Sequence, residues 1–269
     1  MPEVVRCLTV LRTASGREVE VSLFGPPQDR LDVAAIVFSH GANSAPGRYR
    51  RLFDAWAAAG FLVCAPLHVD SEDHPDRMTS DRSIVREFRL EDFALVVAAL
   101  ANGAFERPET RFVAAGHSYG ALIAQVAGGA RLDSDVAARM PAIERPVCVV
   151  ALSPPPPIPG LVSDRSWQTL DVPMLCVTGT ADEMPAFVDD WRLHLASHRV
   201  AQRSFAAVFD GMDHYFNGAF GRLKGPVRGL AVDALNEMVI AFVRKWACEG
   251  GVTPEQWAAA STAGVLRFV

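Results

Sequence analysis

Short apolar runs alternate with stretches of helical periodicity along most of the chain. Apolar runs of this kind are typical of strands buried on both faces of a sheet. They predict strands at 33–38, 61–66, 111–115, 146–152, 172–178 and 203–209, and two further strands at 4–11 and 18–24. Because the first two strands flank the tight turn at Ser15-Gly16, we expect them to form an antiparallel pair at one edge of the sheet.

Helical stripes separate many of these strands. The apolar residues from Tyr49 to Trp56 follow the i, i+3, i+4, i+7 spacing, which predicts a helix over 48–59 that ends at Gly60. Similar stripes predict helices around 93–100, 120–129 and 235–246. Strand and helix alternation predicts an α/β fold, in which helices cover a mostly parallel sheet on both faces.

The domain organisation follows from the same pattern. No proline-, glycine- or serine-rich linker divides the chain, so we expect a single domain over 1–269, with 252–269 as a C-terminal appendage whose role stays open. The predicted elements use nearly all of the residues, which leaves too few for a large cap domain inserted between strands.

Composition excludes several classes of protein. A hydrophobic content of 50% with 21% charged residues excludes a disordered chain, and a net charge of −5 argues against binding nucleic acid through a basic surface. The longest uncharged window, 112–130, contains glycines and polar residues, so we expect no membrane span. No secretory signal is visible, which favours a cytoplasmic location. The five cysteines form no CxxC pair, which disfavours a disulfide framework or a zinc ribbon.

One motif carries candidate chemistry. Gly116-His117-Ser118-Tyr119-Gly120 is a G-x-S-x-G sequence between a predicted strand and a predicted helix. A serine on such a sharp turn has its hydroxyl exposed above the sheet, and the flanking glycines remove side chains that would collide with neighbouring elements. Ser118 is therefore the candidate nucleophile, and a plain glycine-rich turn is the alternative.

A serine nucleophile needs a histidine base, and the base needs an acid that orients it. Asp182 follows the next-to-last predicted strand in a glycine turn, and His214 follows the last one. This Ser, Asp, His order is the one expected on an α/β sheet. Glu183 is a weaker candidate for the acid, and Asp210 and Asp213 lie too close to the histidine in sequence to be preferred.

An oxyanion hole needs two backbone amides directed at the developing negative charge. The amide of Tyr119, directly after the nucleophile, is one candidate. The other is the amide of Ala42, because Gly41 allows a turn that directs it inward. An ordinary strand-to-helix turn is the alternative interpretation of the loop at 38–44.

The remaining histidines invite other interpretations. The loop His68-Val-Asp70-Ser-Glu-Asp73-His74 could bind a divalent metal in a metal-dependent hydrolase, although a polar rim loop is the favoured interpretation and we predict no metal site. His40 and His117 are expected to shape loops.

A second pair of histidines lies on one helical stretch. His194 and His198 are four residues apart, but Leu195 stands where a zinc protease has glutamate, so a solvated helix face is predicted.

Aromatic residues near the predicted pocket suggest an apolar or aromatic substrate group. We expect His68, Trp167, Tyr215 and Phe216 to contribute to substrate binding, with Tyr119 nearby. Packing of the pocket rim is the alternative role for each.

These motifs resemble a known family. His40-Gly41-Ala42, the motif around Ser118, Gly179-Thr-Ala-Asp182 and Asp213-His214 look like the four landmarks of α/β-hydrolase-fold serine hydrolases. The stretch at 38–75 looks most like the dienelactone-hydrolase and platelet-activating-factor-acetylhydrolase-like branch, although dienelactone hydrolases usually carry cysteine as the nucleophile. The resemblance implies about eight strands and no metal or organic cofactor.

The resemblance also implies an activity: hydrolysis of a small-molecule carboxylic ester with a small acyl, aryl or lactone group, through a Ser118–His214–Asp182 triad and an acyl-enzyme. An acyltransferase or thioesterase would use the same triad, and a non-catalytic binding protein on the same fold is an alternative of another class. We expect a monomer or a homodimer.

Overall fold

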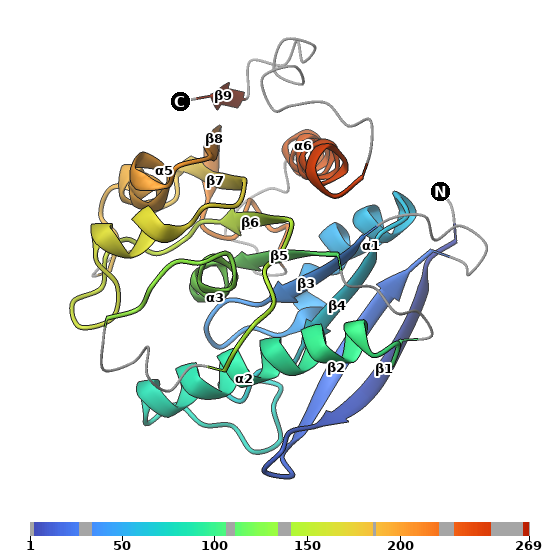
Figure 1. The fold of residues 1–269 in the computed structure, drawn as a ribbon. Coiled ribbons are helices and arrows are strands. Elements are labelled where there is room, and N and C mark those ends of the chain that lie inside the picture. The colour runs from blue at the N-terminus through green and yellow to red at the C-terminus, as the bar shows by residue number, and fades with distance from the viewer. Residues whose placement is uncertain are drawn as a thin grey trace.

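The computed structural model describes residues 3–26, 34–105, 111–133, 141–184, 187–220, 229–248 and 266–268. Its strands form one sheet in the order β1-β2-β4-β3-β5-β6-β7-β8-β9 (Figure 1). Their bounds are β1 Val5–Arg12, β2 Glu18–Gly25, β3 Ala35–Ser39, β4 Leu62–Pro66, β5 Phe112–His117, β6 Cys148–Leu152, β7 Met174–Ala181, β8 Ser204–Asp213 and β9 Leu266–Phe268.

The sheet is parallel through its centre and antiparallel at its edges. All neighbours from β4 to β8 run parallel, whereas β1 pairs antiparallel with β2, and β2 pairs antiparallel with β4. The predicted mostly parallel sheet of about eight strands, with an antiparallel pair at its edge, is confirmed. The strand β9 adds to it by pairing antiparallel with β8, within a tail that otherwise lies outside the described residues.

Helices cover both faces of this sheet (Figure 1). One face carries α1 and α6, and the other carries α2 and α3. The helices span α1 Arg50–Ala58, α2 Arg82–Ala101, α3 Tyr119–Ala127, α5 Ala196–Val200 and α6 Gly229–Ala247, with short 3₁₀ turns at η2 Pro46–Tyr49, η3 Asp164–Thr169 and η4 Trp191–Leu195.

Each face of the sheet buries its own hydrophobic core. Phe53 and Trp56 of α1 pack with Phe242 of α6 over one face, whereas Phe93 of α2 and Ile123 of α3 pack over the other. Strands buried on both faces must be apolar throughout, which is why β3, β5 and β6 have continuous apolar sequences.

The helix α2 is longer than the apolar stripe at 93–100 predicts. Its first two turns mix charged residues with the apolar residues Ile84, Val85 and Phe88. The side chain of Asp81 accepts hydrogen bonds from the amides of Ser83 and Ile84. Such a cap satisfies amides that have no acceptor within the helix, so the helix can begin well before its apolar stripe.

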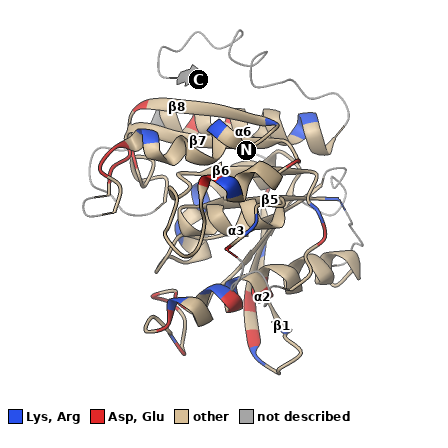
Figure 2. Ribbon diagram, turned by 60° about the vertical axis from the view of Figure 1, so that its left-hand side comes forward, with Lys and Arg blue, Asp and Glu red and all other residues tan. Residues whose placement is uncertain are grey.

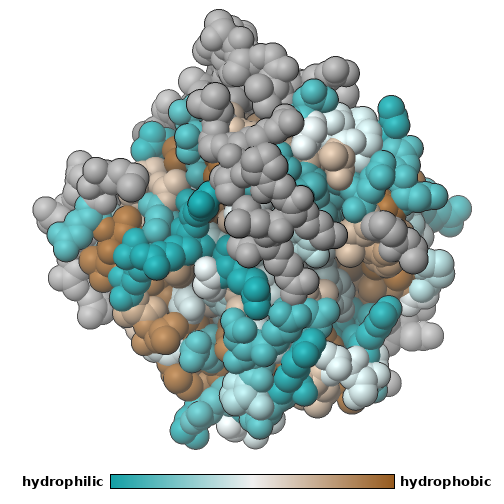
Figure 3. Space-filling view, turned by 180° about the vertical axis from the view of Figure 1, so that it is seen from behind, coloured by the Kyte–Doolittle hydropathy of each residue, from teal (hydrophilic) through white to brown (hydrophobic). Residues whose placement is uncertain are grey.

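Charged side chains are interspersed on the surface. Basic and acidic residues lie close together in the first half of α2 and on the β1–β2 hairpin (Figure 2). Arg12 pairs with Glu18, and Arg17 pairs with Glu91. A view from behind shows hydrophobic residues interspersed among hydrophilic ones (Figure 3). None of the helices in the described ranges is both long enough and apolar enough to cross a bilayer.

Candidate active site

Ser118 lies at a sharp turn between β5 and α3, at the carboxyl end of a central strand. Its backbone has φ 54° and ψ −123°, which L-residues rarely adopt. Strain of this kind costs about 1–3 kcal/mol and is typical of positions where a side chain must be held for chemistry. The Ser118 amide donates a hydrogen bond to the Leu152 carbonyl at 2.8 Å, which ties the turn to β6.

The glycines of the motif permit close packing around this turn. A Cβ on Gly120 would overlap the carbonyl group of Ser39, and a Cβ on Gly116 would overlap the carbonyl of Gly120. The strand β5, the helix α3 and the loop after β3 can therefore approach closely only because both positions lack a side chain.

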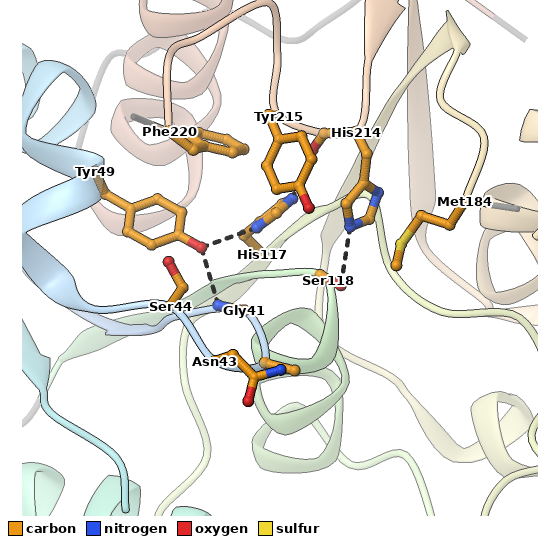
Figure 4. Close-up of a pocket in the computed structure, with 11 residues that line it drawn as sticks. Gly41, Asn43, Ser44, Tyr49, His117, Ser118, Met184, His214, Tyr215 and Phe220 are labelled. Carbon is orange, nitrogen blue, oxygen red and sulfur yellow. Dashed lines mark hydrogen bonds between the residues drawn. The ribbon is translucent and has the colours of Figure 1, made fainter. Parts of the chain in front are cut away.

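Three residues from distant parts of the chain form a continuous hydrogen-bonded chain. His214 Nε2 lies 3.1 Å from Ser118 Oγ (Figure 4). His214 Nδ1 lies 2.7 Å from Asp182 Oδ1. Because a carboxylate only accepts, Nδ1 carries the proton, and Nε2 is free to accept the proton of the serine hydroxyl. The structure thus brings together the three residues that the sequence nominates as nucleophile, base and acid.

The carboxylate of Asp182 is buried and accepts from further donors. Ser153 Oγ and Thr178 Oγ1 donate to its Oδ2 at 2.5 and 2.7 Å. Burial alone would raise the pKa of Asp182, but the contacts with His194 and His214 outweigh it and hold that pKa well below its usual range. The group is therefore an anion throughout the physiological pH range.

A buried arginine holds the loop that follows β3. Arg89 on α2 has no exposed surface and pairs with both carboxylate oxygens of Asp70, at 2.8 and 2.9 Å. It also donates to the carbonyls of His40 and Gly41, at 2.7 and 3.1 Å. Burial would raise the pKa of the Asp70 carboxyl, but the Arg89 guanidinium holds it well below its usual range. The arginine is thus a fixed cation that orients two successive peptide groups.

The orientation of these peptide groups determines where the next amides point. In a trans peptide the carbonyl and the N–H point in opposite directions. The Gly41 carbonyl faces Arg89, so the amide of Ala42 points away from it, and Ala42 lines the same cavity as Ser118. Tyr119 is the first residue of α3, so its amide has no acceptor within that helix.

A second chain of hydrogen bonds connects this loop to the segment that carries His214. The Gly41 amide donates to Tyr49 Oη at 2.9 Å, and that hydroxyl donates to His117 Nδ1 at 2.9 Å (Figure 4). His117 Nε2 donates to the His214 carbonyl at 2.9 Å. The carbonyl at one end only accepts, so His117 Nε2 carries a proton; a neutral ring then accepts at Nδ1 from the Tyr49 hydroxyl. Burial lowers the pKa of His117 well below its usual value, which agrees with a neutral ring.

These residues surround a cavity of about 150 Å³. Its walls are Gly41, Ala42, Asn43, Ser44, Tyr49, His117, Ser118, Met184, His214, Tyr215 and Phe220 (Figure 4). None of these lining residues is Lys, Arg, Asp or Glu. The cavity therefore suits a small neutral group.

Three residues expected at the pocket lie elsewhere. His68 is fully buried between Ser39 and Asp92, and it does not line the cavity. Trp167 packs in the core beneath α3, where its indole N–H donates to Gln125. Phe216 is buried behind Phe220 rather than at the cavity surface. Of the four residues expected to bind substrate, Tyr215 alone lines the cavity.

The loop proposed as a metal site does not gather its ligands. His68 Nδ1 donates to Asp92 at 2.8 Å, and Asp70 is occupied by Arg89, whereas Asp73 is exposed. Burial lowers the pKa of His68 well below its usual value, and the nearby Arg89 adds to the effect. His74 Nδ1 accepts from the amide of Asp76, and Asp73 pairs with Arg48, so the four candidate ligands have separate partners.

His194 was expected on a solvated helix face, and the structure corrects this expectation. Its side chain is 1% exposed, on the 3₁₀ turn η4, and it contacts Asp182. The 3₁₀ turn η4 directs this ring toward the sheet, whereas His198 in α5 is partly buried beside Ser204.

The sequence also gives no indication of the residues that support the site. Arg89, Ser153 and Thr178 belong to no sequence motif. In the structure, Ser153 is marked by its positive φ of 47°, directly after β6.

The comparisons with known proteins agree with this architecture. The esterase Pf2001 of Pyrococcus furiosus has 14% identity and a TM-score of 0.63, with 90% of this chain and 91% of that chain covered. An esterase of Rhizomucor miehei has 15% identity and a TM-score of 0.64, with 91% of this chain and 83% of that chain covered. A Klebsiella pneumoniae protein classed as a dienelactone hydrolase has 14% identity and a TM-score of 0.62, with 91% of this chain and 98% of that chain covered.

These similarities are similarities of fold, and no curated protein matches the sequence. The family assignment comes from a family model. The model of the alpha/beta hydrolase family matches residues 36–267, which include the turn at Ser118, the loop at Asp182 and the segment at His214. The chain therefore belongs to the alpha/beta hydrolase family.

Proposed function

We propose that the protein is a serine esterase that cleaves small, neutral carboxylic esters through an acyl-enzyme. The observation that carries the proposal is the hydrogen-bonded chain from Ser118 through His214 to Asp182, on a strained turn beside a small cavity. The esterases among the structures of similar fold support the same reaction class.

In the first half of the reaction, Ser118 Oγ attacks the ester carbonyl carbon while His214 Nε2 takes the hydroxyl proton. Asp182 holds the imidazole in the required tautomer and stabilises its charged form. The amides of Ala42 and Tyr119 donate to the oxyanion. The ester C–O bond then breaks, the alcohol leaves with the proton from His214, and the acyl group stays on Ser118.

In the second half, a water molecule takes the place of the alcohol. His214 removes its proton as the water oxygen attacks the acyl carbon, and the same two amides stabilise the new oxyanion. Collapse of this intermediate releases the carboxylic acid and returns the proton to Ser118. A cavity that admitted another alcohol or a thiol here would give acyl transfer.

The cavity limits the substrate class. A cavity of about 150 Å³ holds a group about the size of benzene. Tyr49, Tyr215 and Phe220 bound it with aromatic surface, and none of the described lining residues is a lysine or arginine that could pair with a substrate carboxylate. Neutral esters with short acyl groups fit these walls best.

A panel of p-nitrophenyl esters with acyl chains of increasing length tests the proposal. We expect kcat/KM to be highest for the acetate, propionate and butyrate, and to fall at least about tenfold for the octanoate, because the longer chain exceeds the cavity. Release of p-nitrophenolate provides the measurement. An absence of turnover with every ester would contradict the proposed function, and equal rates along the series would contradict the size limit.

Replacement of Arg89 by methionine tests the role of the buried cation. The change leaves the Asp70 carboxylate buried without its partner, so we expect the free energy of unfolding to fall by about 3–5 kcal/mol. In the fraction that stays folded, kcat/KM should fall by about 10²-fold, because the peptide groups of the oxyanion loop lose their anchor.

The matched control for this variant is Arg82→Met, which removes an exposed arginine at the start of the same helix. Denaturant unfolding and ester turnover should both remain close to those of the unmodified protein. If Arg89→Met kept full turnover per folded molecule, the loop would not depend on this arginine.

A further inference from the structure

The buried ring of His194 faces hydrogen-bond acceptors with both of its nitrogens. Nδ1 lies 2.7 Å from the carbonyl oxygen of Pro154, in the loop after β6. Nε2 lies 3.0 Å from Oδ1 of Asp182, the same oxygen that receives the proton of His214 Nδ1. The Nε2 contact has the distance of an ion pair without the alignment of a hydrogen bond.

Only one protonation state of the His194 ring avoids repulsion from its two neighbouring acceptors. A backbone carbonyl only accepts, so Nδ1 of His194 must carry a proton. Asp182 is a carboxylate, because three further donors converge on its two oxygens. An unprotonated Nε2 would leave its lone pair about 3.0 Å from this anion in a buried site, where their repulsion is poorly screened. A proton on Nε2 turns the contact into a buried ion pair.

We propose that His194 is held as an imidazolium beside Asp182, and that its charge sets the lower pH limit at which His214 can act as a base. This inference rests on the proposed function, since it concerns the same triad. His194 does not touch the reacting atoms, so it is a positioning residue that acts through Asp182.

The groups around His194 support this assignment. Among the described residues, the anion in contact with it is Asp182, which directly follows β7. The ring of His214 lies tilted at a ring-centroid distance of 5.7 Å, and Cys176 Sγ donates to the backbone carbonyl of His194 at 3.5 Å. His117 lies beyond His214 and is neutral. Burial would lower the pKa of His194, but Asp182 and the Pro154 carbonyl outweigh it and raise that pKa above its usual value.

A cation at this position changes what Asp182 does to His214. A lone buried carboxylate would stabilise protonated His214, and in that form Nε2 cannot accept the Ser118 proton. The positive charge of His194 offsets part of this attraction, so the unprotonated base persists to lower pH. Removing the charge should therefore raise the pH needed for activity.

The first experiment measures kcat/KM for p-nitrophenyl acetate against pH in the full chain. We expect His194→Gln to move the midpoint of the acidic limb upward by about one pH unit, with turnover on the alkaline plateau reduced far less. His194→Lys keeps a positive charge and should keep the midpoint close to that of the unmodified protein. An unchanged midpoint in His194→Gln would overturn the proposal.

His198→Gln is the matched control. This histidine lies one turn further along the chain and contacts Ser204 instead of Asp182. The variant should show the unmodified pH profile. A loss of turnover at every pH in His194→Gln, with no shift of the midpoint, would indicate a purely structural role and would also overturn the proposal.

The second experiment needs neither a variant nor activity. Nuclear magnetic resonance of protein with ¹⁵N-labelled histidine reports whether each ring nitrogen carries a proton, and contacts to Pro154 identify the ring of His194. We expect both nitrogens to be protonated at neutral pH, with and without EDTA. An Nε2 without a proton would overturn the proposal. The ligand atoms of Asp182, His194 and His214 lie within 4.8 Å of one another, so a bound metal ion is one possible cause of an unprotonated Nε2. A change in the Nε2 signal on addition of EDTA would identify that cause, and it would overturn the proposal as well. Failure of every ester to react would refute the proposed function and leave this result standing.

Discussion

Replacing Ser118 with alanine should lower kcat/KM for p-nitrophenyl acetate by a factor on the order of 10⁶, the loss expected when a serine nucleophile is removed from an intact triad. The Ser118 hydroxyl lies within hydrogen-bond distance of His214 Nε2, and alanine leaves that nitrogen without this partner. The fold should tolerate the change, because alanine is smaller and keeps the Cβ that the strained turn already accommodates.

Labelling with a fluorophosphonate probe gives an independent measurement of the same prediction. The probe should attach to the unmodified protein, mass spectrometry should map the adduct to the peptide that contains Ser118, and Ser118→Ala should remain unlabelled. Ser80→Ala, at an exposed serine, should label as the unmodified protein does. Labelling of Ser118→Ala to the same extent as the unmodified protein would contradict the assignment of the nucleophile.

The second large effect is expected from Asp182→Asn, which should lower kcat/KM by about 10⁴-fold. The amide keeps the shape of the side chain but removes the negative charge that stabilises protonated His214. Its NH₂ group would also face a donor, either His214 Nδ1–H or the hydroxyls of Ser153 and Thr178. The imidazole would then be free to adopt the tautomer that cannot accept the serine proton.

Glu183→Gln is the control for this variant, and it also tests the weaker candidate for the acid. Glu183 is exposed on the same loop and should be replaceable with turnover changed by less than about twofold. Circular dichroism and thermal unfolding of both variants separate a catalytic loss from a folding loss. If Glu183→Gln lost activity as Asp182→Asn does, the role given to Asp182 would not stand.

Much of the fold could be predicted because the apolar pattern is strong. Strands buried on both faces must be apolar at every position, so β3, β5 and β6 are visible as uninterrupted runs. Ser118, Asp182 and His214 could be nominated because each follows such a run, and carboxyl ends of parallel strands meet at one edge of the sheet.

The rest of the site depends on which way side chains point, and sequence spacing does not specify that. Trp167 and Tyr215 are both aromatic residues on late connections, yet one packs beneath α3 and the other lines the cavity. In the sequence, Arg89 is one of several charged residues on a helix, and its role becomes visible only when the loop after β3 is placed against it. His194 lies on a polar stretch whose short 3₁₀ turn directs it inward, so periodicity alone predicts an exposed ring.

The hydrogen-bonded chain through Tyr49 and His117 has a consequence for the order of events during folding. Its two side-chain links join residues 68 and 97 positions apart in the sequence. Contacts this distant carry a large loop-closure entropy and form only once the intervening strands have assembled. A chain emerging from the ribosome would therefore carry Ser118 before the loop at 38–44 is organised. Reactivity toward esters in the cell would be confined to molecules whose sheet is complete.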